Sequence, residues 1–327
     1  MDKKMWGILV HLGKDGQDIY NNVDKAVWDE IVEGCIENNI NTIVLSLAGG
    51  VRYASHPELA EPNAWTREEI RFQVKRLKES GITLIPKLNF STSHGQWLKE
   101  YTRMISTNTY YKVCRELISE VYTLFDSPKY IHLGMDEEDA AHQKDCEYAV
   151  YRQGELKWHD FQYLCDCVRD TGATPWVWAD FYMDDTEEFK ARIRRENIIL
   201  SPWYYNSIKP EHYTPIASRA EYVEHYAKNF PGNNFTYVEE EPFCVNFLNK
   251  APHLAKDGYK IVPCVSTINQ CVYNTPELAE YFKELAPDEL LYGYITAPWI
   301  PANKENIDVF KESVRLLNAA REAFYNG

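Results

Sequence analysis

The feature that most constrains the fold of this chain is a repeated alternation between short apolar segments and longer amphipathic ones. Several of the short segments are continuously apolar, which is typical of parallel strands buried on both faces. The alternation therefore predicts a parallel sheet whose strands are joined by helices. The predicted strands are Trp6–Leu12, Thr42–Leu47, Ile82–Leu88, Tyr130–Leu133, Pro175–Ala179, Ile198–Trp203, Lys260–Val265 and Leu291–Ala297.

Helical periodicity occupies the intervals between these strands. Two helix starts carry capping residues: Asn22 precedes the first helix, and Thr66 with Glu69 matches a capping box before the second. The predicted helices are Val23–Asn38, Arg67–Ser80, Tyr110–Phe125, His159–Thr171, Thr186–Glu196, Ala217–Asn229, Glu277–Leu285 and Glu305–Tyr325. Eight strands that alternate with helices predict a closed (β/α)8 barrel, or TIM barrel, of the α/β class.

The chain has 327 residues, enough for one such barrel with an insertion, so we expect a single domain over residues 1–327. Segment 235–257 exceeds the basic repeat and is expected to be an insertion between the sixth and seventh strands. An open doubly wound sheet is the alternative fold. The turn after the first strand, Gly13-Lys-Asp-Gly16, lacks the GxGxxG pattern that nucleotide-binding proteins of that class usually carry.

Charge and composition restrict the partners. A net charge of −14 argues against nucleic acid, because phosphate binding needs a positive surface. No apolar run is long enough to cross a bilayer, and Trp6–Leu12 already reads as a strand, so neither a membrane partner nor a signal peptide is expected. The cysteines lack zinc-site spacing; Cys35, Cys114, Cys165 and Cys264 fall in helices or a strand, which favours buried thiols. No metal or organic cofactor is implied, and the compartment and the oligomeric state stay open.

In a TIM barrel the chemistry sits where strands end and the following loops begin. The fourth strand ends in His132-Leu-Gly-Met-Asp-Glu-Glu138. Crowded, partly buried carboxyl groups push their pKa values apart, so that one stays protonated as an acid while its neighbour is ionised. Glycoside hydrolysis needs this division of labour. The alternative is a solvated acidic turn before a helix, but the position after a central strand, with Gly134 allowing close approach, favours a site.

The motif His-x-Gly-x-Asp-Glu on the fourth strand resembles the signature of glycoside hydrolase family 20, the β-N-acetylhexosaminidases. The resemblance implies that Glu137 is the general acid/base. It implies that Asp136 orients and stabilises the 2-acetamido group of the substrate, whose carbonyl oxygen is the nucleophile. His132 would then support the site from within or beneath it.

Other strand ends supply candidate substrate-binding residues. The third strand leads to His94 and keeps the Pro and His of the family pattern, but Lys87 and Asn89 replace its acids. His94 faces the pocket or is a surface residue. After the fifth strand, Asp180 would hold a sugar hydroxyl and Trp178 would line the floor.

Aromatic residues end the sixth and eighth strands. Trp203, Tyr205 and Trp299 are expected to form apolar walls for a sugar ring, with core packing as the alternative. The family places an arginine on its first strand to grip sugar hydroxyls. This chain lacks it, so His11 or Arg52 would substitute.

These features predict a retaining, exo-acting hydrolase of N-acetylhexosamine-containing glycans that works by substrate-assisted catalysis. One alternative keeps Glu137 as acid/base and takes a protein nucleophile from Glu239, Glu240 or Glu241. The other is a non-catalytic carbohydrate-binding barrel. The retained Asp136–Glu137 pair favours the enzyme, since a pure binder needs no general acid.

Overall fold

The computed structural model describes residues 4–13, 23–144, 146, 148–209, 250–251, 253–268 and 271–325. The chain divides into two compact units, which are treated separately below. The first unit comprises Met1–Leu9, Asp24–Asn41 and Ser201–Gly327; the second comprises Val10–Val23 and Thr42–Leu200. Predicted helix Ala217–Asn229 and most of predicted insertion 235–257 lie outside the described residues.

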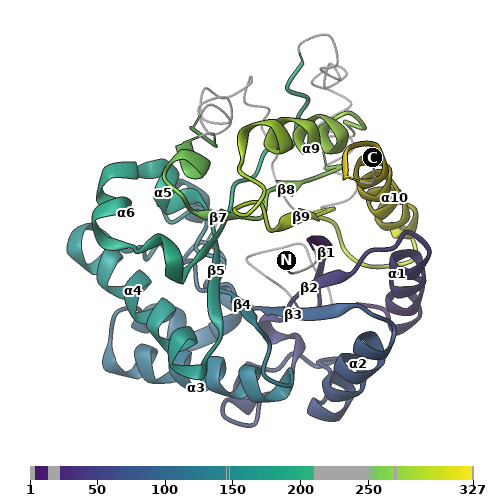
Figure 1. Ribbon diagram of the computed structural model, residues 1–327. Coiled ribbons are helices and arrows are strands. Elements are labelled where there is room, and N and C mark those ends of the chain that lie inside the picture. Colours follow the sequence, from purple (N-terminus) through teal and green to yellow (C-terminus); the bar gives the residue numbers. More distant parts are fainter. Residues whose placement is uncertain are drawn as a thin grey trace. The chain divides into compact units, whose positions relative to one another are not determined.

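The second unit is a parallel sheet in which strands that are consecutive in the chain are neighbours (Figure 1). Its strands are almost entirely buried, which explains their continuously apolar sequences. The strands are β2 (Thr42–Ser46), β3 (Thr83–Lys87), β4 (Tyr130–His132) and β5 (Thr174–Trp178), and β6 (Ile199–Ser201) follows at the end of the unit. Helices α2 (Arg67–Glu79), α3 (Asn108–Leu124) and α4 (Gly154–Thr171) connect them, followed by α5 (Asp180–Asp184) and α6 (Thr186–Arg192).

Local sequence sets the ends of these helices. The predicted capping box begins α2: the Thr66 side chain accepts from the Glu69 N–H at 3.2 Å, and the Glu69 carboxylate accepts from the Thr66 N–H at 2.8 Å. Helix α4 ends at Gly172, whose φ of 98° is a left-handed conformation that favours glycine. Both signals are local, so they are readable without knowledge of the tertiary fold.

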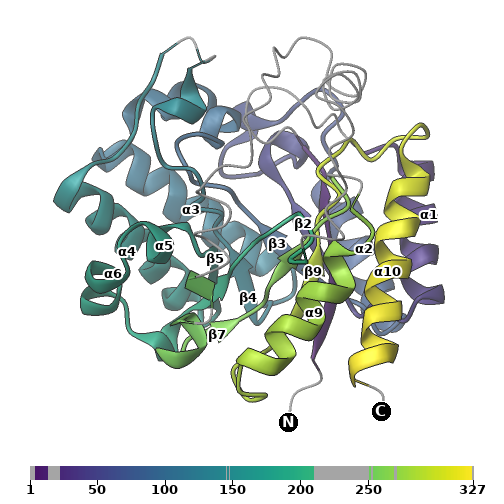
Figure 2. The same cartoon turned by 90° about the horizontal axis from the view of Figure 1, so that it is seen from above.

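The first unit also builds a parallel sheet, in which β1 (Met5–His11) pairs with β9 (Gly293–Thr296) through Met5–Ile8, and β9 pairs with β8 (Cys264–Val265). A short strand β7 (Lys260–Ile261) precedes β8. Helices α1 (Lys25–Glu37), α9 (Asn274–Leu285) and α10 (Ile307–Tyr325) lie side by side along this unit (Figure 2).

The strand predictions agree with the structure, except that one predicted strand is divided into two. The predicted strand Lys260–Val265 is split into β7 and β8 at Val262 and Pro263, because a proline has no N–H to donate to the ladder. One capping prediction is wrong. Helix α1 begins at Lys25, so its cap is Asp24, whose carboxylate accepts from the Ala26 N–H at 2.9 Å, and not Asn22.

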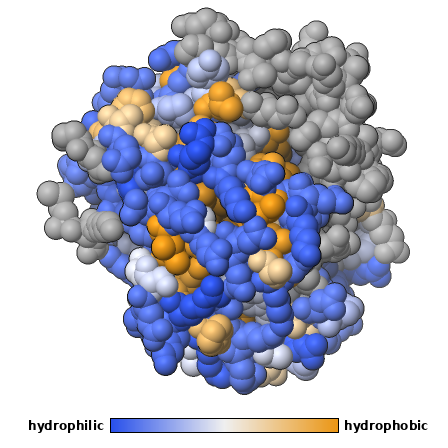
Figure 3. All heavy atoms as spheres, turned by 90° about the vertical axis from the view of Figure 1, so that its right-hand side faces the viewer, coloured by the Kyte–Doolittle hydropathy of each residue, from blue (hydrophilic) through white to orange (hydrophobic). Residues whose placement is uncertain are grey.

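The surface drawn in Figure 3 is predominantly hydrophilic, with small apolar patches. Within the described ranges, no helix combines the length and the apolar character needed to cross a membrane. Cys35, Cys114, Cys165 and Cys264 are buried free thiols, as predicted.

Candidate active site

The loop that follows β4 has an unusual backbone. Met135 and Glu137 have positive φ angles of 67° and 52°, a region that costs energy for residues other than glycine. Two serines from the loop after β3 hold this segment: Ser91 Oγ donates to the Asp136 carbonyl, and Ser93 Oγ donates to the Glu137 carbonyl. Such side-chain bonds to backbone carbonyls keep a strained loop in one conformation, which is a common property of functional sites.

Gly134 permits a close contact on which the position of Asp136 depends. A Cβ at Gly134, where φ is 71°, would lie 1.9 Å from Asn89 Oδ1. Asn89 Nδ2 donates to Asp136 Oδ1 at 3.0 Å. Asn89, which stands where the resembled family has an acid, therefore orients the Asp136 carboxylate rather than repelling it.

Glu137 lies between two histidines. His94 Nε2 is 3.1 Å from Glu137 Oε2 and 3.4 Å from Asp136 Oδ2, and His142 Nε2 is 3.6 Å from Glu137 Oε1. The side chains of Asp136 and Glu137 remain 14% and 31% exposed, so a ligand can reach both. The Glu137 N–H donates to Asp180 Oδ1 at 3.2 Å, which ties the loop to the start of α5.

The two histidines decide the charge state of Glu137. Partial burial by itself raises the pKa of this carboxyl. The hydrogen bond and the charge of His94, followed by the charge of His142, outweigh it, so the pKa lies below its usual value. A cluster of carboxylates without the histidines would instead raise the pKa of its acid. The sequence argument missed the shift because it counted the neighbouring carboxylates and not the histidines.

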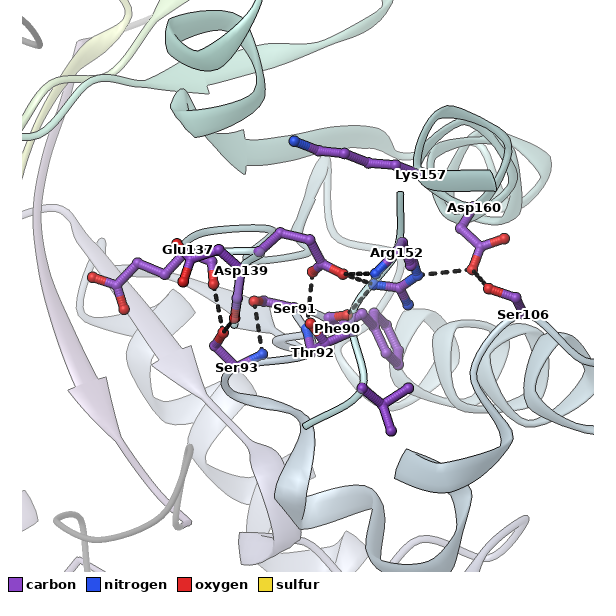
Figure 4. Close-up of polar contacts among 12 residues, drawn as sticks. Phe90, Ser91, Thr92, Ser93, Ser106, Glu137, Asp139, Arg152, Lys157 and Asp160 are labelled. Carbon is purple, nitrogen blue, oxygen red and sulfur yellow. Dashed lines mark hydrogen bonds and ion pairs between the residues drawn. The ribbon is translucent and has the colours of Figure 1, made fainter. Parts of the chain in front are cut away.

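The third carboxylate of the motif, Glu138, has a structural role. Its side chain is buried against Arg152, with Arg152 Nη1 2.9 Å from Glu138 Oε1, and Glu138 Oε2 accepts from the Thr92 N–H at 2.9 Å. Arg152 Nε also contacts Asp160 Oδ2 at 2.7 Å (Figure 4). Ser106 and Tyr111 donate further hydrogen bonds to Asp160.

This Glu138–Arg152–Asp160 network is a buried, hydrogen-bonded support beneath the loop. Arg152 lowers the free-energy cost of burying two carboxylates. Burial by itself raises the pKa of Asp160, but the hydrogen bond from Tyr111 and the charge of Arg152 lower it by more, so the pKa of Asp160 lies below its usual value. Figure 4 shows Arg152 in contact with Asp160, which in turn accepts from Ser106, while Glu137 and Asp139 lie at the other end of the cluster with Ser93. The structure thus separates the three acids of the motif into a buried one, Glu138, and two that solvent reaches, Asp136 and Glu137.

His132 and Trp178 lie in the interior of the second unit, 0% and 1% exposed. His132 Nδ1 accepts from the Gly134 N–H at 3.0 Å, so the ring proton of the neutral imidazole is on Nε2. Its ring centroid is 4.7 Å from that of Trp178. His132 therefore supports the backbone of the β4 loop from beneath, and Trp178 packs behind it.

The first unit carries the predicted aromatic wall as a connected group. Trp203 stacks on Tyr205 with ring centroids 5.3 Å apart, and Tyr205 lies 6.1 Å from Trp299. All three side chains are partly exposed, and Trp299 has a φ of 54°, a strained value for a bulky residue. A partly exposed aromatic group of this kind suits the apolar face of a sugar ring. That it shares a pocket with Asp136 and Glu137 stays a prediction.

Arg52 and His11, the two residues expected to substitute for the missing first-strand arginine, lie in different environments. Arg52 is exposed, and its Nε donates to the Ala64 carbonyl at 3.1 Å within its own loop. His11 is buried, with 3% of its surface exposed. The contacts described for Arg52 join it to no carboxylate of the β4 loop, and its role in substrate binding remains a prediction.

Sequence reasoning missed the residues that hold the site together: Ser91, Ser93, His142 and Arg152. The Ser-Thr-Ser run after β3 was a usable signal, since alternate residues of an extended segment point the same way. Arg152 was not predictable, because its spacings of 14 residues from Glu138 and 8 residues from Asp160 match no local motif. Among the described residues, no group of three or more His, Cys, Asp and Glu side chains is arranged to hold a metal ion.

No protein-family model matches the sequence, and no curated protein sequence matches it. Solved structures do. The chain is similar to a chitobiase from Flavobacterium johnsoniae (TM-score 0.60, 16% identity, 95% of this chain and 47% of that one). It is similar to a β-N-acetylhexosaminidase from Bacteroides fragilis (TM-score 0.60, 12% identity, 98% and 66%) and to dispersin B (TM-score 0.58, 14% identity, 99% and 100%).

These likenesses show the fold: the chain is a (β/α)8 barrel of the α/β class, as its alternating pattern predicted. The chain spans about half the length of the first two structures, 47% and 54%. Two further matched structures are described as family 20 glycoside hydrolases. The fold is therefore that of the family which the motif on β4 resembles.

Proposed function

We propose that this protein is a glycoside hydrolase that releases terminal N-acetylhexosamine residues with retention of configuration, using the substrate's acetamido oxygen as nucleophile. The observation that carries the proposal is the arrangement on the β4 loop. Two adjacent, solvent-accessible carboxyl groups, Asp136 and Glu137, are each held by a different polar partner, Asn89 and His94. Adjacent carboxylates in different environments are what acid/base and electrostatic roles require.

In the proposed mechanism, Glu137 protonates the glycosidic oxygen as the bond to the anomeric carbon breaks and the acetamido oxygen attacks that carbon. The departing alcohol takes the proton, and Glu137 is left as a carboxylate. Asp136 faces the acetamido nitrogen and stabilises the positive charge that develops there. Glu137 then removes a proton from water, which opens the cyclic intermediate and restores the acid.

The low pKa of Glu137 in the ligand-free protein bears on this mechanism. His94 Nε2 lies 3.1 Å from Glu137 Oε2, and this contact favours the ionised form of the carboxyl group, which lowers its pKa. A bound sugar excludes water from the carboxyl group, which favours its neutral form. The proton can then reside on Glu137 when the glycosidic oxygen is in place.

The substrate class is supported by two facts. The matched structures include proteins described as a chitobiase and as β-N-acetylhexosaminidases. The partly exposed group Trp203, Tyr205 and Trp299 supplies aromatic surfaces for a sugar ring and for the acetamido methyl group. The missing first-strand arginine is the reason to test several sugars.

The proposal is tested with nitrophenyl glycosides of GlcNAc, GalNAc, glucose and galactose. We expect cleavage of the acetamido sugars and far slower cleavage of the plain hexosides. Glu137→Gln should lower kcat/KM by about 10²- to 10⁴-fold on a poor leaving group, because it removes the proton donor. Glu187→Gln, at an 85% exposed glutamate of α6, is the matched control and should act like the parent protein. Equal rates for Glu137→Gln and Glu187→Gln would exclude Glu137 as the acid.

A second experiment separates the two hydrolytic mechanisms. A thiazoline mimic of the cyclic intermediate should inhibit strongly, since it resembles a species that the proposed site stabilises. Asp136→Asn should impair catalysis, because it removes the charge that faces the acetamido nitrogen. The rival nucleophiles Glu239, Glu240 and Glu241 lie outside the described residues. A covalent 2-fluoro-glycosyl adduct on one of them, detected by mass spectrometry, would overturn the acetamido mechanism.

A further inference from the structure

His142 is held in a fixed orientation by Asp139. Its Nδ1 lies 3.0 and 2.9 Å from the two carboxylate oxygens of Asp139, and its backbone N–H donates to Asp139 Oδ1 at 3.0 Å. Burial raises the pKa of Asp139, but the contacts with His142 outweigh it and lower that pKa, so Asp139 is an acceptor at neutral pH. Nδ1 of His142 must therefore carry a hydrogen.

The opposite ring nitrogen faces the proposed acid. His142 Nε2 lies 3.6 Å from Glu137 Oε1, whereas His94 contacts the other oxygen, Oε2, at 3.1 Å. The two histidines thus face different oxygens of the Glu137 carboxyl group. They come from separate segments, His94 from the loop after β3 and His142 from the short helix Ala141–Gln143.

This geometry requires a proton between His142 and Glu137. With Nδ1 protonated, a neutral His142 would turn the lone pair of Nε2 toward a carboxylate oxygen, which is repulsive. Either the ring is a cation or Oε1 carries the proton. Because 3.6 Å exceeds hydrogen-bond reach, no hydrogen bond from the described residues occupies Oε1. Oε1 is therefore the oxygen that a glycosidic oxygen can approach.

We propose that His142, oriented by Asp139, is a positioning residue whose protonated ring faces Oε1 of Glu137, the oxygen that His94 does not bind, and stabilises the carboxylate that this acid becomes. The inference rests on the proposed function and adds a second histidine to it. His142 itself transfers no proton in this scheme and is protonated before and after the step: Glu137 gives its proton to the leaving oxygen, and the cationic ring stabilises the carboxylate that remains. Replacement of His142 would leave His94 as the single imidazole next to Glu137 among the described residues.

Several charges face Glu137, and the test must separate them. Within the described residues these are His94 and Asp136, Asp139 and His142, and Asp180, which accepts the Glu137 N–H. His142→Gln removes one cation and keeps a polar side chain. His159→Gln is the matched control, because His159 is also a partly exposed histidine beside a carboxylate, 3.2 Å from Asp160, but contacts no residue of the Glu137 pair.

The primary measurement is the titration of Glu137 by carbon NMR in protein with labelled glutamate, assigned with Glu137→Gln. His142→Gln should move this titration upward by about half to one pH unit, the size expected of a unit charge near 4 Å at a partly exposed site. His159→Gln should leave it unchanged. An unchanged titration in His142→Gln would overturn the proposal, and this readout needs no enzymatic activity.

Kinetics give the second measurement. In His142→Gln the basic limb of kcat/KM against pH should shift upward by the same amount, and poor leaving groups should lose more rate than activated ones. Asp139→Asn should give the same pattern more weakly, because the ring stays but loses its orienting partner. If the parent protein cleaves no glycoside, the proposed function fails, while the NMR titration still decides whether His142 acts on Glu137. A shift in the titration with no change in the rate profile would also reject the positioning role.

Discussion

Replacement of Arg152 by methionine tests the claim that a buried ion network supports the catalytic loop. The side chains of Arg152, Glu138 and Asp160 are 0%, 1% and 0% exposed. Removal of one partner of a buried pair costs about 3–5 kcal/mol, because the remaining charge is left without compensation. Arg152 compensates two carboxylates, so we expect a loss near the upper end, about 5 kcal/mol, a large part of a typical domain stability.

The pH dependence of this loss is the sharper test. In the parent protein the pKa of Asp160 is lower in the folded state than in the unfolded state. Asp160 therefore stabilises the fold at pH values above its unfolded-state pKa, and this stabilisation is lost as the pH falls through its folded-state pKa. In Arg152→Met we expect burial, no longer opposed by the Arg152 charge, to raise the pKa of Asp160. The folded variant is then favoured at low pH and loses stability as the pH rises, so the slope of stability against pH reverses in the acid range.

Urea unfolding followed by tryptophan fluorescence, repeated between about pH 4 and about pH 8, measures both effects. The control is Arg192→Met, since Arg192 also pairs with two glutamates, Glu155 and Glu188, but at the surface. It should lose much less stability and keep the parent slope. If Arg152→Met fails to fold, the triple variant with Glu138→Gln and Asp160→Asn should recover folding. Equal losses for the two arginine variants, or an unreversed slope, would refute the reasoning.

Two other changes follow from the site. Gly134→Ala should lower kcat much more than Glu187→Gln does and displace Asn89 from Asp136, because its Cβ would lie 1.9 Å from Asn89 Oδ1; a crystal structure with Asn89 unmoved would contradict this. Trp299→Ala should raise KM for a GlcNAc glycoside by about tenfold or more with less effect on kcat, since burying an aromatic surface is worth about 1–3 kcal/mol; steady-state kinetics measures it, and an unchanged KM would remove the aromatic group from the binding site.

The sequence alone determined the barrel, the start of α2 and the acidic motif at the end of β4. These depend on short-range properties: continuous apolar strands, helical periodicity, and a capping pair three residues apart. The first helix cap was missed by two residues, because Asn22 and Asp24 are both good caps and only the helix start distinguishes them.

Only the tertiary structure decided what each carboxylate of the motif does. Glu138 and Glu137 are neighbours of one type, yet one is buried on Arg152 and the other lies between His94 and His142. Their different roles depend on how the fold places these partners, of which His94 comes from the loop after β3, and the sign of the Glu137 pKa shift depends on distances of a few ångströms. Such charge interactions vary steeply with separation and burial, which a linear pattern of residues does not contain.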